Sequence, residues 1–182
     1  MRTVFDVVVL LLTLTAGIDS PLAPRVRSSH PYIRAMIAEA QVRSETFRVL
    51  VHAIEATDGI VYVEEGDCPA ALRACFPPVL TPAGGFRFLR VLVDARQEDW
   101  QVMSDIGHEL QHALEVLGDP RIRTSDGALE HLSRRDDFSS MKLVYETNEA
   151  VKAGEAIKRE VKAFARSRAT KGRSRMTSNR AK

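Results

Sequence analysis

The chain has 182 residues, of which 45% are hydrophobic and 27% charged, a composition ordinary for a soluble globular protein. This length suffices for one domain with a core of its own and hardly for two. The net charge of +2 conceals an asymmetry: residues 166–182 carry seven Lys/Arg and no acid, which leaves 19 basic and 24 acidic residues elsewhere, a net of −5. We therefore expect a mildly acidic folded body followed by a basic tail.

The N-terminus has the pattern of an export signal. Arg2 precedes the apolar run VVVLLLTLTAG, and Thr15 and Gly17 provide small residues at positions −3 and −1 of a cleavage after Gly17. The run is too short to span a bilayer comfortably, so a permanent N-terminal membrane anchor is the alternative. We expect residues 1–17 to be a signal peptide and the mature protein to be periplasmic or secreted. Residues 18–30, polar and containing proline, are predicted to form an extended linker.

Hydrophobic periodicity predicts the elements of one domain over residues 31–165. Helices are predicted where apolar residues recur at three and four: 31–57, 98–117, a weaker short helix over 124–135, and 141–164. Two β-branched or alternating segments, 60–65 and 86–94, are predicted to be strands. This order indicates an α+β domain with a small sheet. Residues 166–182 are too polar and charged to pack, so we expect a disordered basic tail that could touch anionic surfaces.

The only two cysteines, Cys68 and Cys75, lie close together in GDCPAALRACF. In an exported protein, an even and closely spaced pair is most simply a disulfide that closes a small loop. Two buried free thiols are the alternative.

The segment His108-Glu109-Leu110-Gln111-His112 matches H-E-x-x-H and lies in the predicted helix 98–117. Residues four apart on a helix project from one face, so both imidazoles can reach one Zn²⁺. Glu109 points away from the metal but can reach a water beside it and act as general base. The pattern therefore predicts a catalytic zinc site with His108 and His112 as ligands and Glu109 as the base.

The phase of this helix supports a site. An apolar stripe would anchor it on the core, and its members are Met103, Ile106, Leu110, Leu114 and Leu117. The two histidines lie roughly opposite the stripe, so we expect them to face a cleft or solvent. The alternative is a surface helix whose polar face carries two histidines that bind no metal.

A third metal ligand is required. The long metzincin pattern fails, because Glu115 and Gly118 occupy the positions that need glycine and histidine. A glutamate from a later helix is the remaining common solution, and the candidates are Glu130, Glu146 and Glu149, with His131 as an outsider. Glu146 falls near the centre of the apolar stripe of the predicted helix 141–164, where a lone carboxylate must be paired, protonated or bound to a metal. We therefore predict Glu146 as the third ligand, with a salt bridge to an arginine as the alternative.

The stretches IGHELQHALEV and YETNEAVKAGEAIKREV together resemble a group of small, exported bacterial gluzincin-type proteins. The match is strongest in these two segments and extends weakly to the paired cysteines and to GFRFLRV. The resemblance implies a zincin-like fold and a zinc-dependent hydrolase with Glu146 at the ligand position, and it implies no substrate.

Other groups could complete such a site. Asp105 and Glu115 lie on the face of His108 and could orient an imidazole. Tyr145 or His131 could stabilise the oxyanion of a tetrahedral intermediate. The strand 86–93 could offer its edge to an extended peptide.

The leading functional prediction is an exported zinc metallopeptidase acting on a peptide or protein substrate. The alternative is a zincin-fold scaffold or binding module that holds zinc without turnover. A third reading, a peptide-deformylase-like enzyme, would use Cys68 as the third ligand. No nucleic acid is expected, because no Gly-rich phosphate loop follows a strand and no aromatic residues interleave with basic ones.

Overall fold

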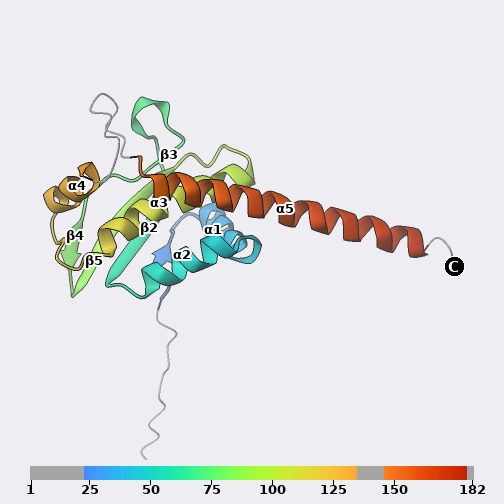
Figure 1. Cartoon of the computed structure of the whole chain (residues 1–182), viewed down its shortest axis with the longest axis horizontal. Coiled ribbons are helices and arrows are strands. Elements are labelled where there is room, and N and C mark those ends of the chain that lie inside the picture. The colour runs from blue at the N-terminus through green and yellow to red at the C-terminus, as the bar shows by residue number, and fades with distance from the viewer. Residues whose placement is uncertain (1–22, 135–145, 180–182) are drawn as a thin grey trace, which may run out of the picture.

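The computed structural model describes residues 23–134 and 146–179, with side chains up to residue 170. The predicted signal peptide therefore lies outside the described residues. The five helices of this part of the chain are α1 (Pro31–Arg43), α2 (Glu45–Glu55), α3 (Asp99–Leu117), α4 (Ser125–Ser133) and α5 (Asn148–Asn179). The strands are β1 (Val26–Arg27), β2 (Gly59–Glu65), β3 (Ala74–Cys75), β4 (Thr81–Ala83) and β5 (Phe86–Val93). The predicted α+β class is confirmed (Figure 1).

The strands form one mixed sheet centred on β5. β5 runs parallel to β2, and β2 runs parallel to β1. On the other side of β5, β4 pairs antiparallel with its beginning and β3 with its end. Among the described residues, β2 covers one side of β5 along its length, and on the other side residues 89–91 alone lack a strand partner, so β5 offers an extended peptide at most a short edge. The three short strands were missed because two or three residues are too few to show a strand pattern.

β1 corrects the predicted linker 18–30. Its Val26 is buried in the core and pairs with Val61 of β2. The end of this segment is therefore part of the domain, because an apolar residue beside a parallel strand can join both the ladder and the core.

The predicted helix 31–57 is two helices that meet at Ser44. The backbone of Ser44 is extended, and its Oγ accepts a hydrogen bond from Phe47 N–H, which caps α2. Glu160 of α5 binds the same corner, accepting hydrogen bonds from Ser44 Oγ at 2.6 Å and from Thr46 Oγ1 at 2.7 Å. The break thus gives α5 a polar anchor on α2.

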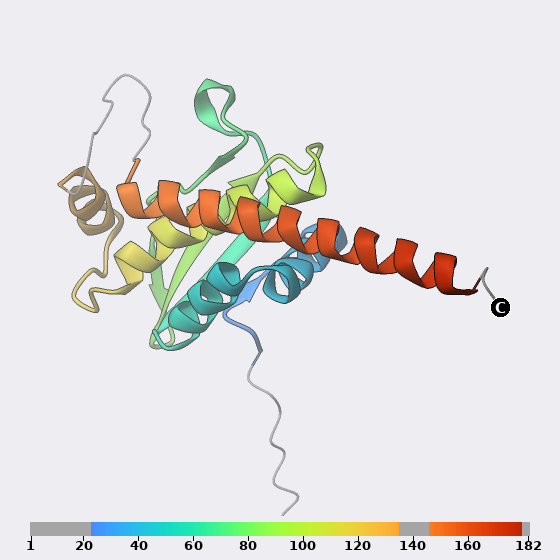
Figure 2. The same cartoon turned by 45° about the vertical axis from the view of Figure 1, so that its right-hand side comes forward.

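The helix α5 begins later and ends later than the sequence predicts. Thr147 caps it, since Thr147 Oγ1 accepts a hydrogen bond from Ala150 N–H. At the other end, α5 continues to Asn179 through the basic segment predicted to be disordered. This segment has several good helix formers and no proline, so the anchored helix can propagate through it. The C-terminal half of α5 extends away from the rest of the described chain (Figures 1 and 2).

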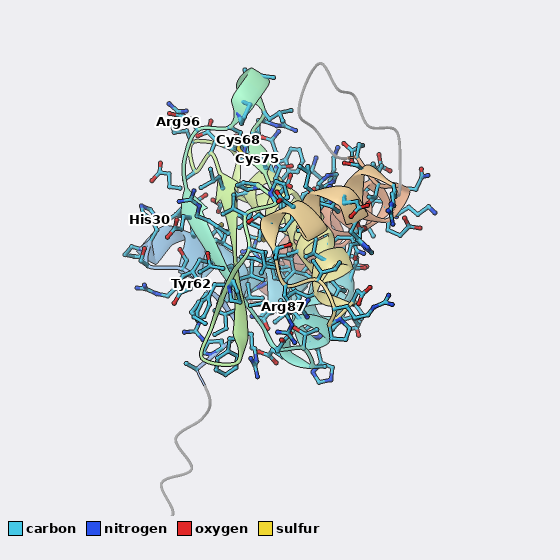
Figure 3. The ribbon with its side chains drawn as sticks, turned by 90° about the vertical axis from the view of Figure 1, so that its left-hand side faces the viewer. His30, Tyr62, Cys68, Cys75, Arg87 and Arg96 are labelled. Carbon is cyan, nitrogen blue, oxygen red and sulfur yellow. A yellow bond between two sulfur atoms is a disulfide. The ribbon has the colours of Figure 1, made fainter. Side chains whose placement is uncertain are left out.

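A buried arginine holds the end of α3. Arg87 of β5, 1% exposed, donates to the carbonyls of Val116 and Leu117 in the last turn of α3 and to those of Asp119 and Ile122 beyond it. Its Nε also donates to Asp58 Oδ1 at 2.7 Å. Burial alone would raise the pKa of Asp58, but hydrogen bonds from Arg87 and Arg123 lower it. Arg87 shares the buried face of β5 with Leu89 and Val91 (Figure 3).

Cys68 and Cys75 form a disulfide, so that prediction is confirmed (Figure 3). The bond closes the loop that leads into β3. It also excludes Cys68 as a thiolate ligand, so the peptide-deformylase-like reading is wrong. Over residues 23–134 and 146–179, no helix combines the length and hydrophobicity needed to cross a membrane.

Candidate metal centre

Two glycines let α5 lie close against α3. A Cβ on Gly107 of α3 would stand 2.1 Å from Cδ1 of Ile157, and one on Gly154 of α5 would stand 3.2 Å from Cβ of His108. Ser104 Oγ donates a hydrogen bond to the carbonyl of Gly154 at 3.0 Å. The start of α5 therefore packs directly on the face of α3 that carries His108, and both views show the two helices side by side (Figures 1 and 2).

Three side chains converge at this contact. His108, His112 and Glu146 each offer one ligand atom, and the three atoms lie within 4.8 Å of one another. The imidazole rings are 5.0 Å apart, and His108 Nε2 lies 3.1 Å from Glu146 Oε1. His112 is 2% exposed, whereas the side chain of Glu146 is 47% exposed. The group thus has a buried side at His112 and an open side at Glu146.

The donor set fits a transition metal such as zinc. Two imidazole nitrogens and one carboxylate oxygen are ligands that Zn²⁺ accepts at about 2.0–2.2 Å. Two ligands of one tetrahedral ion are then about 3.3–3.6 Å apart. Donors that all lie within 4.8 Å of one another need only small side-chain rotations to share an ion.

The contact between His108 and Glu146 shifts the pKa values of the two groups in opposite directions. Burial alone would lower the pKa of His108, but the hydrogen bond with Glu146 and the charge of Glu109 raise it. The same hydrogen bond is the main reason why the pKa of Glu146 is lowered. The partner of Glu146 is therefore a histidine of the motif and not the arginine that the sequence left as an alternative.

The buried carboxylate of Glu115 lies beside the imidazole of His112. His112 Nδ1 lies 3.5 Å from Glu115 Oε2, and neither atom has a hydrogen-bond partner among the described residues. Thr147 Oγ1 donates to the other oxygen of Glu115 at 2.8 Å. Burial alone would raise the pKa of Glu115, but its contacts with His112 and Thr147 lower it. An anionic Glu115 beside Nδ1 leaves Nε2 of His112 as the ligand atom.

Glu109 lies buried beside the group. Burial raises the pKa of Glu109 to about 7, against the opposing charges of His108 and His112. Among the described residues, no hydrogen bond or ion pair engages its carboxylate. A carboxyl with a pKa near neutrality can both take up and release a proton at physiological pH, which is what a general base requires.

The other candidate ligands lie elsewhere. Glu130 of α4 forms an ion pair with Arg134 on the surface, and Glu149 is exposed in the first turn of α5. His131 is also in α4. None of these three belongs to the described ligand group. Tyr145 lies outside the described residues.

The surroundings of the site differ from the sequence prediction in two ways. The histidines were expected to face a cleft or solvent, but α5 covers that face of α3, so His112 is buried while the side chain of His108 remains 22% exposed. Glu146 does not lie on an apolar helix face. It precedes the cap of α5 and is half exposed. Thr147 was missed, although a threonine followed by Glu149 in a first turn is a signal for a helix start.

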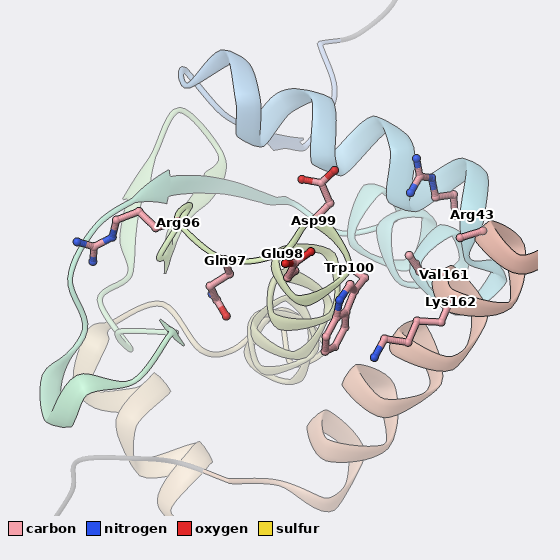
Figure 4. A pocket seen from close by; sticks show the side chains of 9 residues that line it. Arg43, Arg96, Gln97, Glu98, Asp99, Trp100, Val161 and Lys162 are labelled. Atoms are coloured by element: carbon pink, nitrogen blue, oxygen red, sulfur yellow. The ribbon is translucent and has the colours of Figure 1, made fainter. Parts of the chain in front are cut away.

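A separate hollow of about 410 Å³ lies beyond the beginning of α3 (Figure 4). It is lined by Trp100 and by Lys162 of α5, whose ammonium is 3.3 Å from the centre of the Trp100 ring. None of the three grouped ligands lines it, so it is distinct from the candidate metal centre.

Comparison with known proteins adds no assignment: no family model, curated protein or solved structure matches the chain.

Proposed function

We propose that the protein is a zinc-dependent metallopeptidase with a zincin-like arrangement of its two site helices. The observation that carries this proposal is the convergence of His108, His112 and Glu146, with Glu109 buried beside them. Three protein ligands leave room for a further one, which is the arrangement of catalytic and not of structural zinc sites. The placement of Glu109 favours turnover over a scaffold, because a site that only holds zinc has no use for a buried carboxylate.

Each side chain has a role in this proposal. A bound Zn²⁺ would polarise the scissile carbonyl and lower the pKa of water at the site to about 7. Glu109 takes the proton of the attacking water and passes it to the leaving amine. Glu115 keeps the proton of His112 on Nδ1 and holds the ring in place. The open side at Glu146 is where the substrate enters.

The substrate in this proposal is a peptide or protein outside the cytoplasm. The Cys68–Cys75 disulfide supports export, because disulfides persist in oxidising compartments. The apolar run near the N-terminus supports it independently.

The proposal is tested by metal-dependent peptide cleavage. We expect the purified protein to cleave members of a random peptide library, to lose this activity on chelation, and to regain it with about one equivalent of Zn²⁺ per chain. Cleavage that persists in the metal-free protein would refute zinc-dependent catalysis. An absence of cleavage by a protein that retains zinc would favour the scaffold.

The role of Glu115 gives a separate prediction. Glu115→Gln should weaken zinc affinity by about 10- to 100-fold, because the neutral amide no longer stabilises the ligand form of His112. Competition with a fluorescent zinc chelator measures this affinity. Glu130→Gln is the matched control, since Glu130 is exposed and outside the group. Equal affinities of the two variants would mean that Glu115 does not support the metal.

A further inference from the structure

The loop closed by the disulfide carries an arginine to α3, the helix that holds two of the three candidate metal ligands. Arg73 lies two residues before Cys75, whose bond to Cys68 ties the loop (Figure 3). The carbonyl of Arg73 accepts a hydrogen bond from Asp94 N–H at 2.7 Å, just beyond the end of β5. The next residue, Ala74, is buried and pairs with Val93. The backbone of Arg73 is therefore held on both sides.

The side chain of Arg73 reaches α3 next to the metal ligands. Its Nε lies 3.7 Å from Oδ2 of Asp105. Asp105 precedes His108 by three residues, so the two side chains lie about one turn apart on one face of α3. Asp105 also interacts electrostatically with His108. The guanidinium is in contact with Asp105, which is itself roughly 5 Å from His108, so it stands up to about 9 Å from the metal group.

Most of this guanidinium is available to a ligand. The side chain of Arg73 is 57% exposed, and its contact with Asp105 is an ion pair without a hydrogen bond. No hydrogen-bond partner among the described residues engages its two terminal nitrogens. A planar guanidinium held at its inner nitrogen presents the outer pair to a carboxylate in bidentate geometry.

We infer that Arg73 is a specificity residue that binds a carboxylate of the substrate close to the scissile bond. This inference rests on the proposed peptidase function. One residue of an extended peptide spans about 3.4 Å, so a group up to about 9 Å from the metal meets the substrate within about three residues of the cleaved bond. The carboxylate is that of an Asp or Glu side chain or of the peptide C-terminus. Lys158, which also acts on Asp105, lies over the ring of Trp100 at 5.5 Å from its centre.

The first test compares cleavage by parent and variants. The parent should prefer peptides with an acidic residue near the cleaved bond. Arg73→Gln should lower kcat/KM for these acidic peptides by about 10- to 100-fold, which corresponds to the loss of one charge-assisted hydrogen bond. The kcat/KM for neutral peptides should change by less than about threefold. Arg73→Glu should shift the preference toward basic peptides. Peptides with an amidated C-terminus distinguish a side-chain carboxylate from the terminal one. Amidation should abolish the preference if Arg73 binds the terminal carboxylate, and leave it unchanged if Arg73 binds an Asp or Glu side chain.

Arg90→Gln is the matched control. Arg90 is 55% exposed and lies 3.7 Å from Glu64, a contact as long as that of Arg73, but it belongs to the exposed face of the sheet. Its replacement should leave the preference unchanged. Cleavage by Arg73→Gln with the preference of the parent would overturn the inference and leave the proposed function intact.

Binding separates the inference from the proposed function. In the Glu109→Gln background, fluorescence anisotropy with a labelled acidic peptide should show about 10- to 100-fold weaker binding when Arg73→Gln is added. Equal binding would overturn the role of Arg73. If the parent cleaves no peptide, the peptidase proposal fails, and this binding difference still decides whether Arg73 is a carboxylate-binding residue.

Discussion

Replacing Glu109 by glutamine should lower kcat/KM for peptide hydrolysis by about 10²- to 10⁴-fold and leave the zinc content unchanged. Glutamine has the shape of glutamate but cannot accept the proton of the attacking water. Glu109 is buried and makes no bond to another described residue, so a neutral amide there removes the base without breaking a structural contact. Steady-state kinetics on the best library peptide, together with elemental analysis, measures both quantities.

Glu115→Gln provides the comparison for this experiment. Its activity should return when zinc is supplied in excess, because the defect lies in affinity. The activity of Glu109→Gln should not return at any zinc concentration. If excess zinc restores Glu109→Gln, or if the variant retains more than about a tenth of the parent kcat/KM, Glu109 is not the general base.

Replacing Arg87 by methionine should lower the free energy of unfolding by about 3–5 kcal/mol, chiefly because buried carbonyls lose their hydrogen-bond donor. Arg87 makes five hydrogen bonds, four of them to carbonyls in the last turn of α3 and the segment after it. Methionine fills similar space but leaves these carbonyls without donors, and each unmet buried group costs about 1–3 kcal/mol. Urea denaturation followed by circular dichroism measures the loss.

The same strand supplies the control for Arg87. Arg90→Met replaces an exposed arginine of β5 and should change the free energy of unfolding by less than about 0.5 kcal/mol. Arg87→Lys should remain strongly destabilised, because an ammonium cannot reach five acceptors spread around a planar guanidinium. A loss below about 1 kcal/mol in Arg87→Met would mean that water replaces the guanidinium at the end of α3.

The regular elements and the ligand spacing could be predicted from the sequence. The period of apolar residues located α3 and β5 to within a residue or two, since burial of one face imposes that period. The interval between His108 and His112 placed both imidazoles on one helix face for the same reason. The disulfide followed from the short interval between Cys68 and Cys75.

The environment of the ligands could not be predicted from period alone. His112 and Glu115 are polar and were expected on an open face, but each is buried because the other is its partner. The burial of this pair depends on α5 packing over it. A contact between residues far apart in sequence produces no local sequence pattern from which it could be predicted. Glu146 was chosen as a ligand from its expected position on one face of a helix. It lies outside that helix, because Thr147 caps α5 and the helix begins at Asn148. Helix ends depend on caps, which periodicity does not register.

The metal content of the purified chain tests the proposed centre most directly. Elemental analysis after zinc-supplemented purification should give about one zinc per chain in the parent and in Glu149→Ala, and a marked loss in Glu146→Ala. Glu149 is the matched control, because it is an exposed glutamate three residues further on, outside the ligand group. One zinc in all three proteins would remove Glu146 from the ligands. No zinc in the parent would contradict a metal centre on α3 altogether.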